Sequence, residues 1–263
     1  MATIEERLNS SILQVTALHI DKTLSSTELD LYESMKELSW KILFGIFLGV
    51  DSDDAHFSTT ESLQEALLRG QFSLFPISLN TGFWHSPREK GIDAKSKLQT
   101  LFSAHFQESK DACPFSVANE DDLQDVANHS VLFTNSLAAK ALASMLTALL
   151  LNLYLYKDAD GRPLATSLVQ EYNPERRAER LRSVSMETER LSPAIVRVMR
   201  RSTQDNLISS PDDQADIKVP KGWDCWLYFA GAGRDPSAFG PTWDEFDPAR
   251  YLSEGVPRGI AFG

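Results

Sequence analysis

The amino-acid sequence predicts a mainly α-helical protein with a small β region and a long meander towards its C-terminal end. Apolar residues recur at helical spacing through most of the chain before Arg201, and no internal repeat or low-complexity segment interrupts them. After Arg201, glycine and proline become frequent and β-branched and aromatic residues appear, which favours short strands and irregular structure. A chain of 263 residues, 42% of them hydrophobic and 24% charged, is long enough to bury a substantial core.

The elements follow in order from spacing and from turn residues. Apolar positions at helical spacing predict the N-terminal helices, Gly70 is expected to end one of them, and the DADGR stretch at residues 158–162 indicates a turn. A loop rich in aromatic residues is expected at residues 71–87, and a strand entered through a turn at residues 219–223. The expected helices span residues 31–50, 61–69, 90–109, 123–156, 163–172, 174–185 and 184–190.

The chain is acidic, with 37 Asp and Glu residues, 26 Lys and Arg residues and a formal net charge of −11. Nucleic-acid binding is not expected, because phosphate contacts need clustered cations. The densest basic cluster, Arg197 with Arg200 and Arg201, falls in a segment interpreted as helical, where internal charge pairing is its expected role. Two cysteines, Cys113 and Cys225, are too few for a disulfide framework and are expected to be reduced and buried.

Targeting signals are not visible in the sequence. The opening residues MATIEERLNSS contain an acidic pair and no apolar stretch, unlike a signal peptide. The longest apolar run, residues 141–156, includes Ser144, Thr147 and Asn152 and is interpreted as a core helix, not as a membrane span. We therefore expect a soluble, cytoplasmic protein.

Three motifs follow one another in the C-terminal third. Residues 187–193 read ETERLSP, residues 219–239 read VPKGWDCWLYFAGAGRDPSAF, and residues 246–251 read FDPARY. Alone, E-x-x-R carries little information, because i,i+3 ion pairs occur on many helices. In this order and spacing, the three resemble the E-T-x-R-L-x-P, V-P-K-G-W…R-D-P-x-x-F and F-x-P-x-R-F motifs of cytochrome P450s.

The resemblance implies a P450-like helical lobe with a small β region and a C-terminal meander, matched weakly before Asp125 and strongly after Glu187. It implies a single domain, residues 1–263. Within it, residues 1–122 would form roof helices and the aromatic loop, residues 123–201 the central and E-x-x-R helices, and residues 202–263 the β region and meander. It also implies a buried structural triad, since a hydrogen-bonded set of charges tolerates burial better than a lone charge. The triad residues are Glu187, Arg190 and Arg250.

The sequence departs from the family pattern in three respects. It ends at Ala261-Phe262-Gly263, which resembles only the opening of the F-G-x-G-x-R-x-C haem-binding loop, and neither cysteine maps onto the ligand position. The N-terminal β-rich lobe and anchor have no counterpart. On the central helix, Leu137 and Ala138 replace the acid and alcohol of A-G-x-[DE]-T, which relay protons to iron-bound oxygen. We therefore expect a truncated, haem-free protein without cofactor or metal, in which Arg200 still matches a propionate-binding arginine.

A mostly apolar pocket is expected between the central helix and the aromatic loop. Four polar residues could donate hydrogen bonds there, namely Arg197, Asn135, Ser136 and His85, although His85 and His129 are also typical of surface or helix-packing histidines. For the aromatic residues, simple core packing is an equal alternative. The expected lining residues are Phe72, Phe75, Phe83, Trp84, Phe133, Leu137, Ile195, Val196 and Val198.

The leading hypothesis is a haem-independent, cofactor-free cyclase or isomerase of an apolar, terpenoid-like secondary metabolite. An intramolecular Diels–Alder closure asks least of side chains, because a shaped pocket folds the substrate into a near-attack conformer and hydrogen-bond donors polarise a conjugated carbonyl. The alternative is a non-enzymatic, P450-derived ligand-binding or accessory protein, whose apolar face a partner or a second copy in a homodimer would cover. A third reading is the remnant of an inactive P450 gene. No Ser-His-Asp order, phosphate-binding glycine loop or metal-ligand spacing indicates another chemistry.

Overall fold

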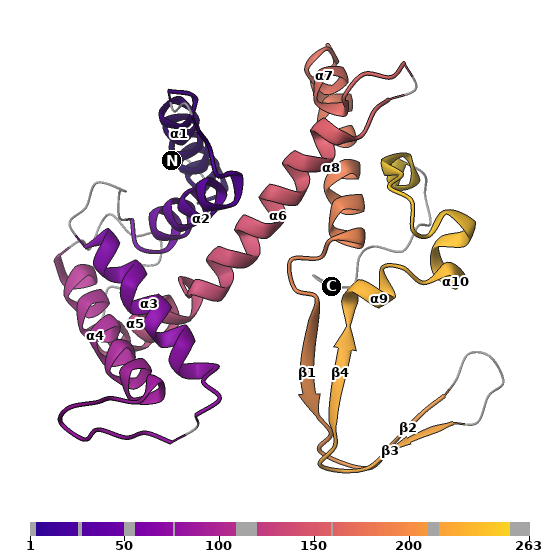
Figure 1. The fold of residues 1–263 in the computed structure, drawn as a ribbon. Coiled ribbons are helices and arrows are strands. Elements are labelled where there is room, and N and C mark those ends of the chain that lie inside the picture. Colours follow the sequence, from indigo (N-terminus) through magenta and orange to yellow (C-terminus); the bar gives the residue numbers. More distant parts are fainter. Residues whose placement is uncertain are drawn as a thin grey trace. The chain divides into compact units, whose positions relative to one another are not determined.

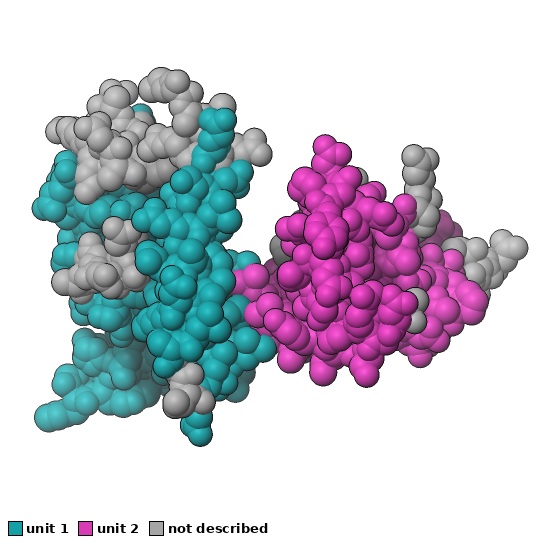
Figure 2. Space-filling model, turned by 90° about the horizontal axis from the view of Figure 1, so that it is seen from above, with its two compact units in different colours: residues 1–144 teal, residues 145–263 magenta. Residues whose placement is uncertain are grey.

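The computed structural model describes residues 4–25, 28–49, 56–75, 77–108, 120–158, 160–209 and 216–252. Helices make up most of these ranges, and the strands form two small antiparallel pairs (Figure 1). The predicted fold class, mainly helical with a small β region, is thereby confirmed. The chain divides into two compact units, Met1–Ser144 and Met145–Gly263, which are coloured separately in Figure 2. Cys113 and the Ala261–Gly263 end, which the sequence analysis used, lie outside the described residues.

Unit 1 is built from helices whose starts follow local capping chemistry. Asp30 caps the second helix, because its carboxylate accepts a hydrogen bond from the backbone N–H of Glu33 at 3.0 Å. The sixth helix begins in unit 1 and continues along the chain into unit 2. The helices are α1 (Ile4–Leu24), α2 (Leu31–Phe47), α3 (Phe57–Gln71), α4 (Pro87–Glu108), α5 (Glu120–Phe133) and α6 (Ser136–Leu155).

One apolar core holds α2, α3, α4 and α5 of unit 1 together. Its buried side chains recur every four residues on α2, α4 and α5, so each of these three helices presents one buried stripe, and α3 adds Leu67. The rings of Trp40 and Phe44 lie 5.0 Å apart, and Phe44 meets the edge of Phe57 at the same distance. The fully buried members include Trp40 and Phe44 of α2, Leu98 and Phe102 of α4, and Ala127 of α5.

A close helix crossing corrects the predicted end of α3. The helix predicted at residues 61–69, with Gly70 as its end, is longer in the structure, where α3 runs from Phe57 through Gly70 to Gln71. Gly70 is needed for packing, because a Cβ there would lie 2.7 Å from the Cα of Gly91 and 2.8 Å from the carbonyl oxygen of Pro87. The backbones of α3 and α4 therefore touch at Gly70 and Gly91.

The predicted single helix at residues 123–156 is divided in two. Helix α5 ends at Phe133, and α6 begins at Ser136. Asn135 causes part of this break, because its side-chain oxygen accepts a hydrogen bond from the backbone N–H of Ala138 at 2.8 Å and so caps α6. By length and composition alone, Asp122–Leu155 could cross a membrane, with a mean hydropathy of 1.5, but the core helix of a soluble protein has the same property.

Unit 2 contains the end of α6 and the E-x-x-R helix. The helices predicted at residues 174–185 and 184–190 are one continuous helix, α8 (Pro174–Leu191), because no glycine or proline follows Pro174 within it. Asn173 caps α8 by accepting hydrogen bonds from the N–H groups of Glu175 and Arg176 at 2.9 and 3.1 Å. The remaining helices are α7 (Leu164–Val169), α9 (Phe229–Ala232), α10 (Pro236–Phe239), η1 (Gly240–Thr242) and η2 (Pro248–Leu252).

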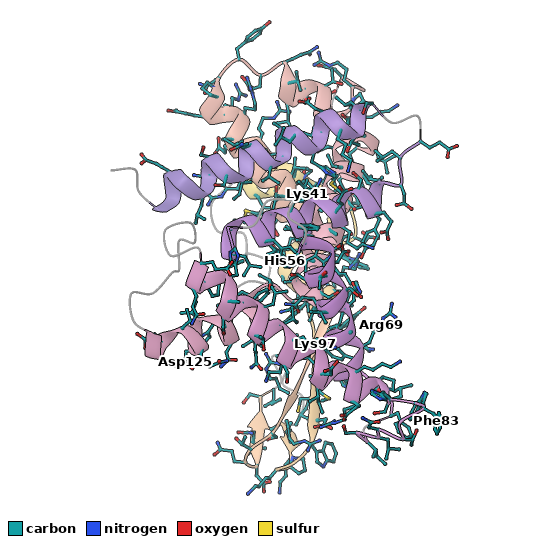
Figure 3. All side chains as sticks on the ribbon, turned by 90° about the vertical axis from the view of Figure 1, so that its left-hand side faces the viewer. Lys41, His56, Arg69, Phe83, Lys97 and Asp125 are labelled. Carbon is teal, nitrogen blue, oxygen red and sulfur yellow. The ribbon has the colours of Figure 1, made fainter. Side chains whose placement is uncertain are left out.

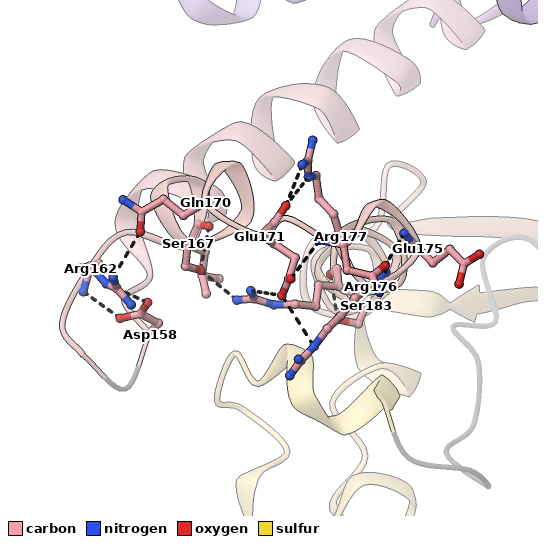
Figure 4. A network of polar contacts seen from close by, with 12 residues as sticks. Asp158, Arg162, Ser167, Gln170, Glu171, Glu175, Arg176, Arg177 and Ser183 are labelled. Carbon is pink, nitrogen blue, oxygen red and sulfur yellow. Dashed lines mark hydrogen bonds and ion pairs between the residues drawn. The ribbon is translucent and has the colours of Figure 1, made fainter.

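Figure 4 shows the polar contacts that tie α7 and the following turn to α8. The carbonyl oxygen of Glu171 accepts two hydrogen bonds from Arg177, at 3.1 and 2.7 Å. Its carboxylate lies 3.6 Å from Arg176 and 3.9 Å from Arg180, and Arg180 also donates to the hydroxyl of Ser167 at 2.8 Å. These three arginines of α8 thus all contact α7 or the turn that follows it.

Four short strands form the β region of unit 2. Strand β1 (Arg197–Arg201) pairs antiparallel with β4 (Asp224–Tyr228), and β2 (Asn206–Ile208) pairs with β3 (Ile217–Val219). The basic cluster at residues 197–201 is therefore a strand, and its assignment to a helical segment was wrong, because the following residues 224–228 supply it with a β partner. Arg201 pairs with Asp224 at 2.7 Å, and Arg197 stacks over the Trp226 ring at 4.6 Å. Cys225, opposite Arg200 on β4, is half-buried instead of buried.

The α1–α2 contact predicts a pH dependence of stability. His19 is 2% exposed, its Nε2 lies 2.9 Å from the hydroxyl of Ser34, and its Nδ1 is buried without a partner. Burial and the neighbouring Lys41 lower the pKa of His19 below its ordinary value of 6.5. The unfolded chain then binds a proton more readily, so we expect the unfolding free energy to be fully present above pH 6.5 and to fall as the pH drops below it.

Urea denaturation of the wild type and of His19→Gln, followed by circular dichroism at several pH values between 5 and 8, measures this effect. The wild type should lose more stability towards acid than the variant, because the other histidines contribute equally to both. Parallel curves for the two proteins would contradict the assignment.

The glycine crossing predicts a second effect on stability. Gly70→Ala should reduce the unfolding free energy by about 1–3 kcal/mol, because the added methyl group cannot fit between two backbones. Gly45→Ala in α2 is the matched control, since a Cβ at Gly45 meets nothing within 4 Å, and it should be neutral or stabilising. Equal effects of the two substitutions in chemical denaturation would show that α3 and α4 can separate without cost.

Candidate functional site

The break between α5 and α6 is held by side chains of the break itself. The hydroxyl of Thr134 donates to the carbonyl oxygen of Ser130 at 2.7 Å, while the amide of Asn135 also donates to the carbonyl oxygen of Leu132. Thr134 is fully buried and Asn135 is half-buried. Asn135 therefore acts as a helix cap, with one amide hydrogen left over after these contacts.

Two consecutive residues of α3 form hydrogen bonds on both sides of this break. The amide of Gln64 donates to the carbonyl oxygen of Val131 at 3.2 Å and to the hydroxyl of Thr134 at 3.1 Å. The carboxylate of Glu65 accepts a hydrogen bond from the hydroxyl of Ser136 at 2.6 Å and an ion pair from Lys140 at 2.9 Å. These contacts hold the pKa of Glu65 below its usual range, against the opposing effect of burial.

Two of the predicted lining residues lie on either side of the break, Phe133 at the end of α5 and Leu137 in the first turn of α6. The ring of Phe133 stacks on Phe47 with centroids 5.3 Å apart and planes within 8°, yet it is still 54% exposed. Leu137 is 47% exposed, whereas Ser136 is fully buried. The apolar side of the break thus faces outward, and the Ser136 hydroxyl is already engaged by Glu65.

The aromatic loop between α3 and α4 is more exposed than a pocket wall. Phe83 is fully exposed at the loop tip (Figure 3), and Phe72, Phe75 and Trp84 are between 42% and 69% exposed. The loop still has a defined shape, because Phe75 meets the edge of Trp84 at 6.0 Å and a β-bridge joins Asn80 to His85. His85 lies on this exposed loop. Packing in the core, the alternative considered for these aromatic residues, does not describe them.

The other predicted site residues lie in unit 2, on or beside β1. Arg197 is exposed and its guanidinium covers the Trp226 ring, Val196 is half exposed, and Ile195 and Val198 are half-buried. The residues predicted to share one pocket therefore fall in two units: His85, Asn135 and Ser136 in the first, Arg197 in the second.

Glu187 and Arg190 form a fully buried ion pair in unit 2. Two guanidinium nitrogens of Arg190 donate to the Glu187 carboxylate at 2.7 and 2.6 Å, and both side chains are 0% exposed. The remaining donors of Arg190 bond the carbonyl oxygens of Gly233, Trp243 and Glu245 at 2.7, 2.5 and 2.8 Å. One side chain of α8 thereby holds three points of the C-terminal meander.

Arg250 approaches the same carboxylate from the meander. Its Nε lies 3.7 Å from Glu187, and its other nitrogens donate to the carbonyl oxygens of Phe239 and Thr242, both at 2.9 Å. The carboxylate of Glu187 also accepts the backbone N–H of Asp247 at 2.8 Å. Burial, together with the Glu187 carboxylate, raises the pKa of the neighbouring Tyr251 to about 12.

The cytochrome P450 family model matches residues 179–263, the stretch that contains this network. The C-terminal third of the chain is therefore similar in sequence to cytochrome P450s. Cytochrome P450 714C2 from Oryza sativa subsp. japonica is 36% identical over 93 residues, which cover 35% of this chain and 16% of that protein.

Solved P450 structures share the fold at low identity. Retinoic acid-bound cyanobacterial CYP120A1 aligns with a TM-score of 0.69 and 17% identity over 95% of this chain and 58% of its own. CYP109E1 from Bacillus megaterium, in complex with testosterone, aligns with a TM-score of 0.67 and 14% identity over 99% of this chain and 64% of its own. The chain thus spans less than two thirds of the length of these P450s.

The described residues include only one that the resemblance to cytochrome P450s assigns to haem binding. Arg200, which the resemblance assigns to a propionate, is exposed, and its guanidinium bonds just the backbone oxygen of Met199. The resemblance assigns Leu137 and Ala138 to the acid and alcohol positions of the central helix. Cys225, the one cysteine in the described ranges, lies within strand β4. No three His, Cys, Asp or Glu side chains in these ranges meet as a metal site. The described residues thus do not supply the acid, the alcohol and the thiolate that the resemblance implies for oxygen activation on haem.

Sequence reasoning missed the residues of α3 that meet the break. Gln64 and Glu65 lie about seventy positions before their partners, and no motif marks them. The one available signal was charge spacing, since Glu61, Glu65 and Arg69 recur every four residues on α3.

The buried ion pair predicts a large stability difference between two superficially similar substitutions. Glu187→Gln should cost about 3–5 kcal/mol, because it leaves the guanidinium of Arg190 uncompensated in the interior. Arg201→Gln breaks the exposed pair with Asp224 and should leave stability essentially unchanged, since water and salt already screen that pair. Urea denaturation followed by circular dichroism compares them, and similar losses for both would show that the network contributes no more than a surface pair.

Proposed function

We propose that this chain is a haem-independent, cofactor-free cyclase or isomerase of an apolar, terpenoid-like metabolite. The carrying observation is the central-helix break, where Leu137 and Ala138 occupy the acid and alcohol positions while Gln64, Asn135 and Thr134 keep the break itself in place. The break is kept, but the acid and alcohol that would relay protons to oxygen are replaced. This combination supports a reaction that does not involve oxygen activation.

Ring closure by proximity fits an apolar surface with few polar groups. Holding a conjugated substrate as a near-attack conformer lowers the entropic part of the barrier, and one hydrogen bond to its carbonyl polarises the reacting double bond. Of the four proposed donors, Ser136 already donates to Glu65. His85, Arg197 and the remaining amide hydrogen of Asn135 are the groups open to a substrate.

The choice of an apolar substrate rests on the exposed aromatic loop and on the fold relatives. Phe72, Phe83 and Trp84 offer ring surface that a polyene or polycyclic skeleton would cover. Two relatives are described with retinoic acid and with testosterone, both of them apolar molecules with a few polar groups.

A non-enzymatic role as an accessory or ligand-binding protein is the second candidate. Leu74 and Phe83 are completely exposed, and the β1–β4 pair has no buried face, with Trp226 and Tyr228 more than half exposed. A partner or a second copy that covers these residues would stabilise the chain without any reaction.

Incubation of the purified chain with conjugated linear terpenoids, without haem or reductant, tests the first candidate. Cyclisation conserves mass, so the product is an isomer that separates from its substrate in liquid chromatography with mass detection. We expect accelerated closure, and a loss of about 10²–10³-fold in kcat when the operative donor is removed in His85→Ala or Arg197→Met. Thr81→Ala is the control for loop integrity, because it removes the hydrogen bonds between the Thr81 hydroxyl and the Trp84 backbone while His85 stays in place.

Three outcomes separate the candidates. Tight binding of the terpenoids without isomerisation would favour the accessory role and contradict the cyclase. A stoichiometric Soret band after haem addition, with turnover that needs a reductant, would contradict both and restore a redox function. Isomerisation that neither donor variant slows would leave the cyclase standing and remove His85 and Arg197 from it.

A further inference from the structure

A groove on the outer face of α3 carries charged groups that the proposed function does not use. It has a volume of about 560 Å³ and lies within unit 1, between α3 and the first turn of α4. Ser58, Glu61 and Glu65 line one part, and Arg69, Pro87 and Lys90 line the other. Arg69 projects from α3 away from the neighbouring ribbons (Figure 3).

The acidic end of the groove is short of positive charge. Glu61 is half-buried and forms no hydrogen bond or ion pair with another described residue. Burial, and the nearby carboxylates of Glu65, Glu33 and Glu37, raise the pKa of Glu61 despite the opposing effect of Lys36. An ammonium group placed beside Glu61 would therefore be attracted by a carboxylate that is partly desolvated and forms no ion pair with the nearby Lys36.

The basic end of the groove carries two cations that are not paired with a carboxylate of the described residues. Among the described residues, neither Arg69 nor Lys90 forms an ion pair, and the two side chains come from different helices. They flank the Gly70–Gly91 contact, where the backbones touch and the helices cannot shift apart without losing that packing. The spacing of the two cations is thus set by a rigid crossing, which suits a fixed anionic group.

The groove is also connected to the central helix. Glu65 contributes to its wall while its carboxylate holds Ser136 and Lys140, and the preceding Gln64 holds the other side of the break. A ligand that pulls on Glu65 would act directly on the first turn of α6.

We propose that this groove binds a small zwitterion, with its ammonium at Glu61 and its carboxylate between Arg69 and Lys90, and that its occupancy is transmitted to the central-helix break through Glu65. Glu61 and Arg69 are eight residues apart, about 12 Å along the helix axis, and their side chains shorten the gap between charges. The ligand class is therefore an ω-amino acid or a dipeptide-sized molecule. This site is independent of the cyclase proposal.

Isothermal titration with three probes of equal length tests the binding. 6-Aminohexanoate carries both charges, whereas hexylamine and hexanoate carry one each, so the zwitterion should bind at least about tenfold more tightly than either. Glu61→Gln and Arg69→Gln should each reduce its affinity about tenfold, towards that of the single-charge probe. Lys97→Gln is the matched control, because Lys97 lies on α4 in an exposed pair with Asp93 and outside the groove.

Two results would overturn the site. Hexylamine binding as tightly as 6-aminohexanoate would show that an acidic chain merely attracts cations, and unchanged affinity in Glu61→Gln and Arg69→Gln would place the ligand elsewhere. Circular dichroism of every variant separates lost binding from lost folding.

Hydrogen exchange tests the transmission to the break. 6-Aminohexanoate should slow amide exchange at residues 131–140 in the wild type, and Ser136→Ala should abolish this effect while leaving the affinity within about twofold, since Ser136 lies outside the groove lining. Unchanged exchange at residues 131–140 on saturation would refute the coupling through Glu65.

Discussion

The burial of Arg190 is the constraint on which unit 2 depends. A guanidinium without solvent must satisfy all of its donors, and here it does so through Glu187 and three carbonyl oxygens of the meander. The meander has no regular secondary structure of its own between η1 and η2, so these hydrogen bonds supply the order that a sheet or helix would otherwise give. Gly233 illustrates how tight the arrangement is, because a Cβ there would lie 2.2 Å from the carbonyl oxygen of Arg190.

The break between α5 and α6 also needs its backbone groups satisfied, and here neutral side chains do so instead of a buried ion pair. The break exposes backbone carbonyls that need partners, and Gln64 and Thr134 provide them from neutral side chains in the core. The charged residues of this region, Glu65 and Lys140, stay near the surface and bind the start of α6 from α3. The polar groups that hold the break therefore come from α3 and from the break itself. Positions 137 and 138 take no part in these contacts and can be apolar.

Exposed apolar side chains distinguish the surfaces assigned to the two candidate functions from the core. Unit 1 buries regular stripes on α2, α4 and α5, yet it leaves Leu74 and Phe83 of the loop fully in solvent. Such residues cost free energy unless something covers them, so both candidate functions share the expectation of an apolar ligand or partner. The groove on α3 differs in kind, because it is lined by charges of both signs and suits a polar molecule.

The sequence by itself determined the resemblance to cytochrome P450s, the fold class and the identity of the triad residues. E-x-x-R, the R-D-P-x-x-F segment and F-D-P-A-R-Y are local patterns, and their residue types indicate a buried charge network. Helix existence also followed from spacing, since apolar periodicity is local. Tertiary structure alone decided that Gly70 packs a crossing instead of ending a helix and that residues 197–201 form a strand. Each of these outcomes depends on a partner distant in the chain, respectively Gly91 and the β4 strand. The division of residues 123–156 into two helices has a local cause in the Asn135 cap and a distant one in the contacts from Gln64. A single sequence carries no record of such contacts, because burial and pairing are properties of the surroundings and not of the residue.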